Sequence, residues 1–269
     1  MSEPSWSSAA DPSRRIGHTV EFHAQIGSTN DRARSALDEP GGDGLAVVAD
    51  VQTAGRGRRG RGWVSPPGVN LMVSVGLRPQ FEPGAAGLLG IVSALAVRDA
   101  CAAVLPGVEL RVKWPNDVVA ADGRKLAGLL VETSLEDGRV ADAVIGAGIN
   151  VNWRHADMPA EVSDRATSLI ELGEGEIDRV ALLARLLAGL DSEVAGLERG
   201  ESPIARLRAV SALDGRQVTV DLGAERLHGR AAGVNDDGLL LLDTDLGRVA
   251  LAIGEVTSVG AADAVGADV

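Results

Sequence analysis

The stretch that most limits the possible folds is GRGRRGRGW, residues 55–63, with four glycines, four arginines and a final tryptophan. Glycine at this density forms neither a helix nor a regular strand, so the stretch is a loop. It follows residues 45–51, an apolar run typical of a buried strand. Glycine lets the backbone approach an anion, and guanidinium groups neutralise phosphate and carboxylate. The loop therefore predicts a site for a small anionic molecule.

Three other interpretations of this loop are weaker. It contains GxGxxG after a strand, but a dinucleotide-binding fold needs a helix to begin there, and residues 64–68, VSPPG, do not start one. A segment that binds single-stranded RNA is disfavoured because the loop is short and lies within an acidic chain. A solvated basic loop leaves the combined density of arginine and glycine unexplained.

Composition limits the class of protein. The chain has 269 residues, 45% of them hydrophobic, which suits one large domain, alone or with a small one. Its net charge of −12 would repel a polyanion, so we expect no DNA binding. Cys101 is the only cysteine, which excludes an intramolecular disulfide and a cysteine-built metal site and favours a reducing, cytoplasmic location.

Neither the amino end nor the most apolar stretch indicates a membrane protein. Residues 1–16, rich in Ser, Pro and Ala, lack the features of a secretory signal, and we expect a disordered tail there and another at 263–269. Residues 84–105 are the most apolar stretch, but Arg98 and Asp99 interrupt it. This pattern predicts a buried core helix that spans no membrane.

The remaining patterns alternate between helices and strands. A capped helix is expected from Ser28 to about Asp38, and an amphipathic helix over 177–197. Strands are expected at 70–77, 110–114 and 118–120, with a hairpin of 126–134 and 139–149. Beyond residue 214, short β-capable runs at 217–222, 227–234, 239–243 and 248–252 predict a small β-barrel.

Lysine is rare, occurring only at Lys113 and Lys125, whereas arginine is abundant. A position that keeps lysine in such a chain can require a compact, mobile ammonium group. Both lysines begin short segments, KWPND at 113–117 and KLAG at 125–128, and a third segment, GAGIN at 146–150, ends the predicted hairpin. Taken singly, each segment is more typical of ordinary structure than of a binding site, because a Trp is more often part of a core, an Asn-Asp pair a turn and a Gly-rich strand end a tight bend.

Taken together and in order, these segments resemble the biotin-protein ligase family. That family carries Ser-Thr-Asn, the glycine/arginine loop, Lys-Trp-Pro-Asn-Asp, Lys-x-Ala-Gly and Gly-x-Gly-Ile-Asn, and all five stand here between Ser28 and Asn150. The resemblance implies an α+β fold, with a mixed β-sheet and flanking helices like those of class II aminoacyl-tRNA synthetases, followed by an SH3-like β-barrel. We expect a catalytic domain over 17–213 and the barrel over 214–262.

The resemblance also implies a role for individual residues. Lys125 and Arg58 would be catalytic, with Lys125 between the carboxylate of biotin and the α-phosphate of ATP, and Asp117 would lie near a Mg²⁺ ion. The implied nucleotide-binding residues are Arg59, Arg61, Trp63, Asn116 and Asn150. The implied biotin-binding residues are Ser28, Thr29, Asn30, Gln52, Gly55, Arg56, Gly57, Arg58, Lys125, Gly128, Gly146 and Gly148.

The implied activity is ATP-dependent formation of biotinyl-5'-AMP, followed by transfer of biotin to a lysine of the biotin carboxyl carrier domain of acyl-CoA or pyruvate carboxylases. Some family members carry an amino-terminal DNA-binding domain, and fewer than thirty residues precede Ser28, so we expect a ligase without repressor activity. The loop arginines repel one another, and we expect the adenylate to supply the counter-charge that orders them. A lipoate or octanoate ligase and an RNA-binding module remain as alternatives.

Overall fold

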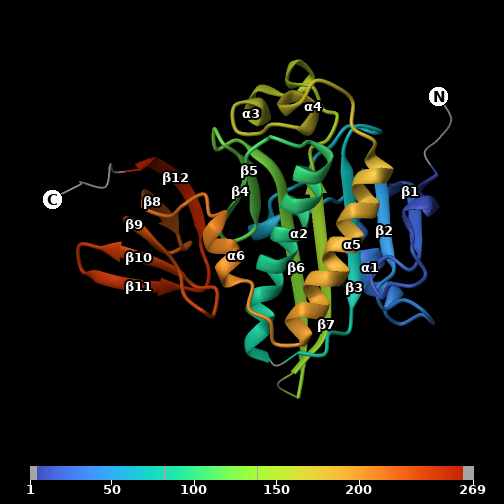
Figure 1. Ribbon diagram of the computed structural model, residues 1–269, viewed down its shortest axis with the longest axis horizontal. Coiled ribbons are helices and arrows are strands. Elements are labelled where there is room, and N and C mark those ends of the chain that lie inside the picture. Colours follow the sequence, from blue (N-terminus) through green and yellow to red (C-terminus); the bar gives the residue numbers. More distant parts are fainter. Residues whose placement is uncertain (1–4, 82, 138, 263–269) are drawn as a thin grey trace.

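A seven-stranded sheet forms the centre of the larger part of the molecule (Figure 1). The computed structural model describes residues 5–81, 83–137 and 139–262. Strands β1 and β2 are parallel and all other neighbours are antiparallel in the order β1-β2-β3-β7-β6-β5-β4, which confirms the predicted mixed sheet. The strands are β1 (Val20–Ile26), β2 (Ala46–Gln52), β3 (Leu71–Leu77), β4 (Leu110–Lys113), β5 (Asp117–Ala120), β6 (Lys125–Glu136) and β7 (Arg139–Ile149).

The alternation of side chains along the strands gives the two faces of this sheet different roles. On β3 and β7, Val73 and Ile145 are buried in the main hydrophobic core. Their neighbours Ser74 and Gly146 pair with each other and lie on the opposite face, because successive residues of a strand point to opposite sides. The predicted hairpin is confirmed as β6 and β7, with residue 138 of its turn outside the described residues.

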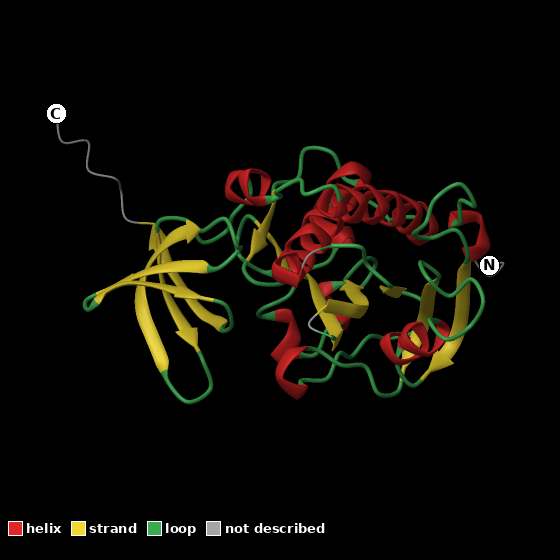
Figure 2. Ribbon diagram, turned by 90° about the horizontal axis from the view of Figure 1, so that it is seen from below, coloured by secondary structure: helices red, strands yellow, loops and turns green. Residues whose placement is uncertain are grey.

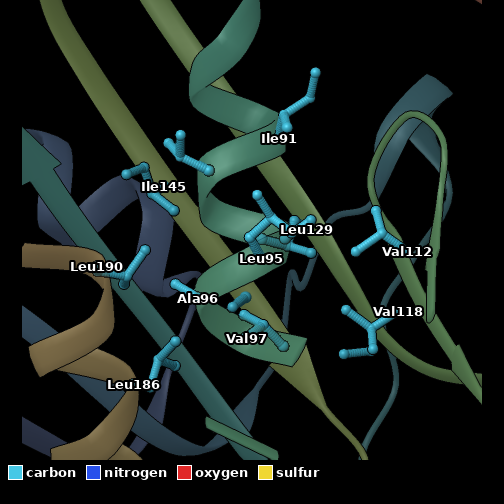
Figure 3. Packing of buried hydrophobic residues seen from close by; sticks show 14 of the residues in the cluster. Ile91, Leu95, Ala96, Val97, Val112, Val118, Leu129, Ile145, Leu186 and Leu190 are labelled. Atoms are coloured by element: carbon cyan, nitrogen blue, oxygen red, sulfur yellow. The ribbon is translucent and has the colours of Figure 1, made fainter. Parts of the chain in front are cut away.

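Two long helices cover the core face, α2 (Leu89–Val104) and α5 (Arg179–Glu198). Figure 3 shows Leu95 of α2 beside Leu129 of the sheet, with Leu186 and Leu190 of α5 on the other side of α2. Each large apolar side chain buried in this way contributes about 1.5–3 kcal/mol relative to its exposed state. The helix α5 begins two residues after the predicted start at 177, because Asp178 is its N-cap and accepts hydrogen bonds from the backbone N–H groups of Val180 and Ala181.

The apolar stretch at 84–104 is long and apolar enough to cross a membrane by length and composition. More than half of its residues are nevertheless buried, most of them in the main hydrophobic core, which confirms the predicted core helix. The α-helical part begins at Leu89, after the 3-10 turn η3 (Pro83–Leu88). Cys101 is fully buried within α2, and burial raises the pKa of its thiol to about 12.

The opposite face of the sheet is covered only in part, by α1 (Thr29–Ala36). Ala33 of this helix packs on Val47 and Val144 in a small second core. Ser28 occupies the N-cap position as the sequence predicts, but its side chain forms no capping hydrogen bond. Beyond α1, this face borders the glycine/arginine loop and a cavity.

The tail predicted over residues 1–16 is wrong for residues 5–16, whereas 1–4 lie outside the described residues. Trp6, in the 3-10 turn η1 (Trp6–Ala9), is 3% exposed and stacks on Phe22 with ring centroids 5.6 Å apart. Ile16 is 1% exposed. Two buried apolar side chains thus hold a segment whose Ser, Pro and Ala content alone indicates disorder. The second predicted tail, 263–269, also lies outside the described residues.

A separate antiparallel sheet lies beside the first (Figure 2). Four of its strands match predicted runs, β8 (Arg216–Asp221), β9 (Arg226–Val234), β10 (Leu240–Thr244) and β11 (Gly247–Leu251), and a fifth, β12 (Glu255–Ala262), was not predicted. The strand order is β11-β10-β9-β8-β12. Because this sheet begins at Arg216, we keep 17–213 and 214–262 as the proposed domain limits.

Short helices connect the two sheets and border the open face. Trp114 Nε1 donates to the carbonyl oxygen of Gly238, 3.1 Å away, and so joins the two sheets. The connecting elements are η4 (His155–Asp157), α3 (Ala160–Ser163), α4 (Leu169–Leu172) and α6 (Ile204–Ala209).

Candidate functional site

A cavity of about 710 Å³ opens on the face of the sheet that α1 leaves uncovered. It brings together all but two of the residues implied by the motifs, although these come from segments far apart in the chain. Gly55 and Arg59 do not line it. The predicted residues that do are Ser28, Thr29, Asn30, Gln52, Arg56, Gly57, Arg58, Arg61, Trp63, Asn116, Asp117, Lys125, Gly128, Gly146, Gly148 and Asn150.

One end of the cavity carries a network of hydroxyl and amide groups. The backbone N–H and Oγ1 of Thr29 donate to Gln52 Oε1 at 2.8 and 3.0 Å. Ser74 Oγ lies within donating distance of both Asn30 Oδ1, at 2.6 Å, and Thr29 Oγ1, at 2.7 Å, and Asn30 Nδ2 donates to Glu132 Oε2 at 2.8 Å. These bonds fix which atoms of Thr29 and Asn30 remain free to bind a ligand, because each hydroxyl has only one hydrogen to donate.

A strip without side chains runs along the floor of the cavity. Gly128 and Gly148 face each other on β6 and β7, and the Trp63 ring lies against them. A Cβ at position 148 would lie 2.4 Å from Trp63 Cε2, and one at position 146 would lie 2.1 Å from Asn30 Oδ1. Both distances are too short for nonbonded atoms, so glycine at these two positions is what lets the indole and the amide approach the sheet.

Positive charge gathers at the other end. Both lysines of the chain, Lys113 and Lys125, line this cavity. Lys125 Nζ lies 2.6 Å from Asp117 Oδ1 and 5.8 Å from the centroid of the Trp63 ring. Burial lowers the pKa of Lys113; the charge of Asp117 raises this pKa, and that of Lys125 lowers it. An arriving anion would relieve the repulsion between these ammonium groups.

The protein's own groups bind each arginine of the loop, so the counter-charge expected from an adenylate is in large part internal. Arg56 forms two hydrogen bonds with the carboxylate of Asp31, which hold the pKa of that carboxyl below its ordinary value. Arg58 Nη1 donates to Asn116 Oδ1 and to the carbonyl oxygen of Gly254, at 3.1 and 3.2 Å, and burial lowers its pKa.

The other two loop arginines reach the second sheet. Arg59 Nη1 donates to Asp221 Oδ1 at 3.0 Å, and Arg61 Nη1 donates to Glu255 Oε1 at 2.6 Å. Glu255 also lines the cavity, together with Val256 and Thr257, so the second sheet forms part of its wall.

Two asparagines that the motifs assign to the nucleotide have backbone partners. Asn116 Nδ2 donates to the carbonyl oxygen of Leu129 at 2.6 Å, and Asn150 Nδ2 donates to that of Thr167 at 3.0 Å. These bonds fix the orientation of both amides, and contact with a nucleotide stays a prediction.

Several groups at the site were not predicted from the sequence. Ser74, with no exposed surface, is the single hydroxyl in the apolar strand LMVSVGL, a signal that could have identified it. Glu132 likewise follows an apolar run on β6. Glu255 gave no comparable local signal, because it reaches the site only through the packing of the second sheet.

Comparison with known proteins places this fold and site in a defined class. Residues 23–150 match the Biotin/lipoate A/B protein ligase family, and residues 215–257 match the Biotin protein ligase C terminal domain. The two matches correspond to the two sheets, with the cavity between the larger sheet, the loop and the first residues of β12.

Individual relatives narrow the assignment. The chain is 38% identical over 246 residues to the biotin--[acetyl-CoA-carboxylase] ligase of Mycobacterium tuberculosis, covering 88% of each. It is 34% identical over 237 residues to the bifunctional ligase/repressor BirA of Bacillus subtilis, covering 86% of this chain and 71% of that one. The biotin protein ligase of Aquifex aeolicus in complex with biotin and ATP superposes with a TM-score of 0.75 at 30% identity, over 88% of this chain and 97% of that one. The chain belongs to the biotin protein ligase family, which confirms the resemblance drawn from the five motifs.

Proposed function

We propose that this protein forms biotinyl-5'-AMP from biotin and ATP and then transfers the biotin to a lysine of a biotin carboxyl carrier domain. The observation that carries the proposal is the polarity of the cavity, with neutral hydroxyl and amide groups at the Asn30 end and ammonium and guanidinium groups at the Lys125 end. Biotin has the matching polarity, because its ureido group is neutral and its other end is a carboxylate.

The polar end suits a ureido group in particular. Thr29 Oγ1 lies within hydrogen-bonding distance of Gln52 Oε1 and Ser74 Oγ, so its one hydrogen is used within the protein and its oxygen is left to accept from a ligand, as the N–H groups of a ureido ring require. Asn30 Nδ2 gives one hydrogen to Glu132 and keeps a second for a carbonyl acceptor. In this assignment the glycine strip between the two ends leaves room for the thiophane ring and the acyl chain.

The cationic end suits the first reaction. An oxygen of the biotin carboxylate attacks the α-phosphorus of ATP, the new C–O–P linkage forms, and the bond to pyrophosphate breaks. Two anions must therefore meet, and we assign Lys125 and Arg58 to neutralise them, because preorganised positive groups stabilise the charge that develops at the phosphorus. Trp63, Arg61 and Asn150 would hold the nucleotide.

A Mg²⁺ ion bound to the triphosphate would neutralise the leaving pyrophosphate. Within the described residues, no group of three His, Cys, Asp or Glu side chains converges to form a metal cage. Asp117 lines the cavity beside Lys125 and is the carboxylate that we assign to contact the ion. A single protein carboxylate fits a Mg²⁺ ion that takes its other ligands from the triphosphate and water and arrives with the nucleotide.

The second reaction transfers the acyl group. The amine of the acceptor lysine attacks the carbonyl carbon of the adenylate, the bond to AMP breaks, and the amine loses a proton as the amide forms. The mixed anhydride hydrolyses readily, so the loop that carries Arg58 must exclude water until the acceptor arrives. We assign carrier domains of acyl-CoA or pyruvate carboxylases as acceptors and the cytoplasm as the location.

The choice of acid tests this proposal. ATP–pyrophosphate exchange should depend on biotin, and lipoate or octanoate should support it at less than about one hundredth of that rate, because those acids leave the buried polar groups around Asn30 unpaired. Exchange supported equally by lipoate would assign the protein to the other branch of the matched family. Exchange with none of these acids would contradict the proposal altogether.

A further inference from the structure

Arg59 differs from the other three arginines of the loop, because its side chain does not line the cavity. Its backbone adopts a left-handed conformation with φ of 57°, which is rare for a residue with a side chain. Its guanidinium group lies on the second sheet, where Nη1 donates to Asp221 Oδ1 at 3.0 Å and Nη2 donates to the backbone oxygen of Asp221 at 2.8 Å. One residue of the second sheet thus binds both arms of one guanidinium group.

Asp221 is itself held in place at the end of β8. Its Oδ1 accepts from the backbone N–H of Gly223 at 2.7 Å, and its Oδ2 accepts from Arg226 Nε at 3.2 Å. These bonds, the one from Gly223 foremost, hold the pKa of Asp221 below its ordinary value, so the carboxylate is charged at neutral pH. The side chains of Asp221 and Arg59 are 20% and 35% exposed, so solvent screens the pair only in part.

A second carboxylate lies directly opposite. Glu255 on β12 is the register partner of Asp221 on β8. Like charges at directly opposite positions of a sheet repel one another. The loop supplies two cations that compensate this repulsion. Arg61 donates to Glu255 at 2.6 Å and Arg59 donates to Asp221. Arg59 Nη1 also lies 4.0 Å from Glu255 Oε2. The two carboxylates of this strand pair are therefore complementary in charge to the two arginines of the loop.

We propose that Asp221 is a positioning residue for the loop, and that Arg59 acts by anchoring the loop to the second sheet in place of the nucleotide contact expected from the sequence. The anchor lies outside the cavity, so it leaves Arg56, Arg58 and Arg61 on the side of the ligand. Its role in the reaction, which rests on the proposed function, is to keep the loop closed over the acyl-adenylate.

The first test needs no ligand. Trypsin cleavage after Arg61 should be about two- to fivefold faster in Asp221→Asn than in the unchanged protein, the range expected when a partly exposed ion pair is lost. Asparagine keeps an oxygen that can accept from Gly223. The matched control is Asp243→Asn, which breaks a similar ion pair of the same sheet, with Arg248 at 2.6 Å, away from the loop. Its cleavage after Arg61 should be unchanged.

The second test follows release of the intermediate. Asp221→Asn and Arg59→Gln should each increase the release of biotinyl-AMP by about two- to fivefold, and the double variant no further, because both changes remove the same contact. Equal melting temperatures for Asp221→Asn and Asp243→Asn would show that the sheet still folds.

Two outcomes would overturn the proposal. Unchanged cleavage after Arg61 in Asp221→Asn would show that the loop is not anchored there. Fully additive effects on release would show that Arg59 acts on the nucleotide directly. If no variant forms biotinyl-AMP, the proposed function fails, and the cleavage rates still decide whether Asp221 anchors the loop.

Discussion

Replacing Lys125 with alanine separates chemistry from stability. The ammonium group lies 2.6 Å from Asp117 Oδ1, and the two side chains are 35% and 23% exposed. Loss of such a pair should change the free energy of unfolding by at most about 1 kcal/mol. For a protein of this size that corresponds to a melting temperature lower by roughly 2–4 °C. Activity should fall far more, because removal of one group that stabilises developing charge costs about 10²- to 10³-fold in kcat.

The assay is ATP–pyrophosphate exchange with saturating biotin, in parallel with thermal unfolding. Lys125→Arg is the control variant, because it keeps the positive charge but replaces the compact ammonium group by a planar guanidinium group. We expect its exchange rate to fall about tenfold. The loss should appear in kcat more than in the KM for biotin, since the lysine acts on charge that forms during the reaction. Wild-type exchange in Lys125→Ala would remove Lys125 from the mechanism. A collapse of the melting temperature would show that its role is structural.

Three further substitutions test other parts of the site. Arg58→Gly should release biotinyl-AMP about ten- to a hundredfold faster, the effect of one lost charge-assisted hydrogen bond, measured as biotin on a bystander protein such as serum albumin. A variant that still makes the adenylate but labels the bystander no more than the unchanged protein does would contradict this. Ser74→Ala should raise the KM for biotin about five- to a hundredfold with little change in kcat. Ser93→Ala, which removes a buried hydroxyl within α2, should leave the KM unchanged. An equal rise in KM in both variants would show a packing defect. Gly148→Ala should weaken ATP binding roughly tenfold in calorimetry, because its Cβ would lie 2.4 Å from Trp63 Cε2, and unchanged affinity would show that the ring moves freely.

Sequence patterns predicted the parts of this fold that depend on local chemistry. The loop was predicted because glycine excludes regular structure, and the β6–β7 hairpin because apolar β-capable runs flank a turn. Lys125 was singled out by the scarcity of lysine, and the structure places it with Lys113 in one cavity. The joint order of the five motifs predicted the family, which no single motif could do.

The parts that were missed depend on contacts distant in sequence. Glu255 forms its bond to Arg61 across 194 residues, and Asp221 bonds to Arg59 across 162, so neither carboxylate carries a local signal of its role. Trp6 shows the opposite error. Composition indicated disorder around it, but one buried ring stacked on the sheet outweighs the polar residues beside it.

The most direct test of the central claim is mass spectrometry of the products formed by the purified protein with biotin, ATP and Mg²⁺, before and after addition of a biotin carboxyl carrier domain. The account predicts biotinyl-5'-AMP and pyrophosphate in the first sample, and AMP with one biotin added to a single carrier lysine in the second. Lys125→Ala should give neither product at a comparable rate. Absence of biotinyl-AMP from the unchanged protein, or its formation equally fast in Lys125→Ala, would contradict the account.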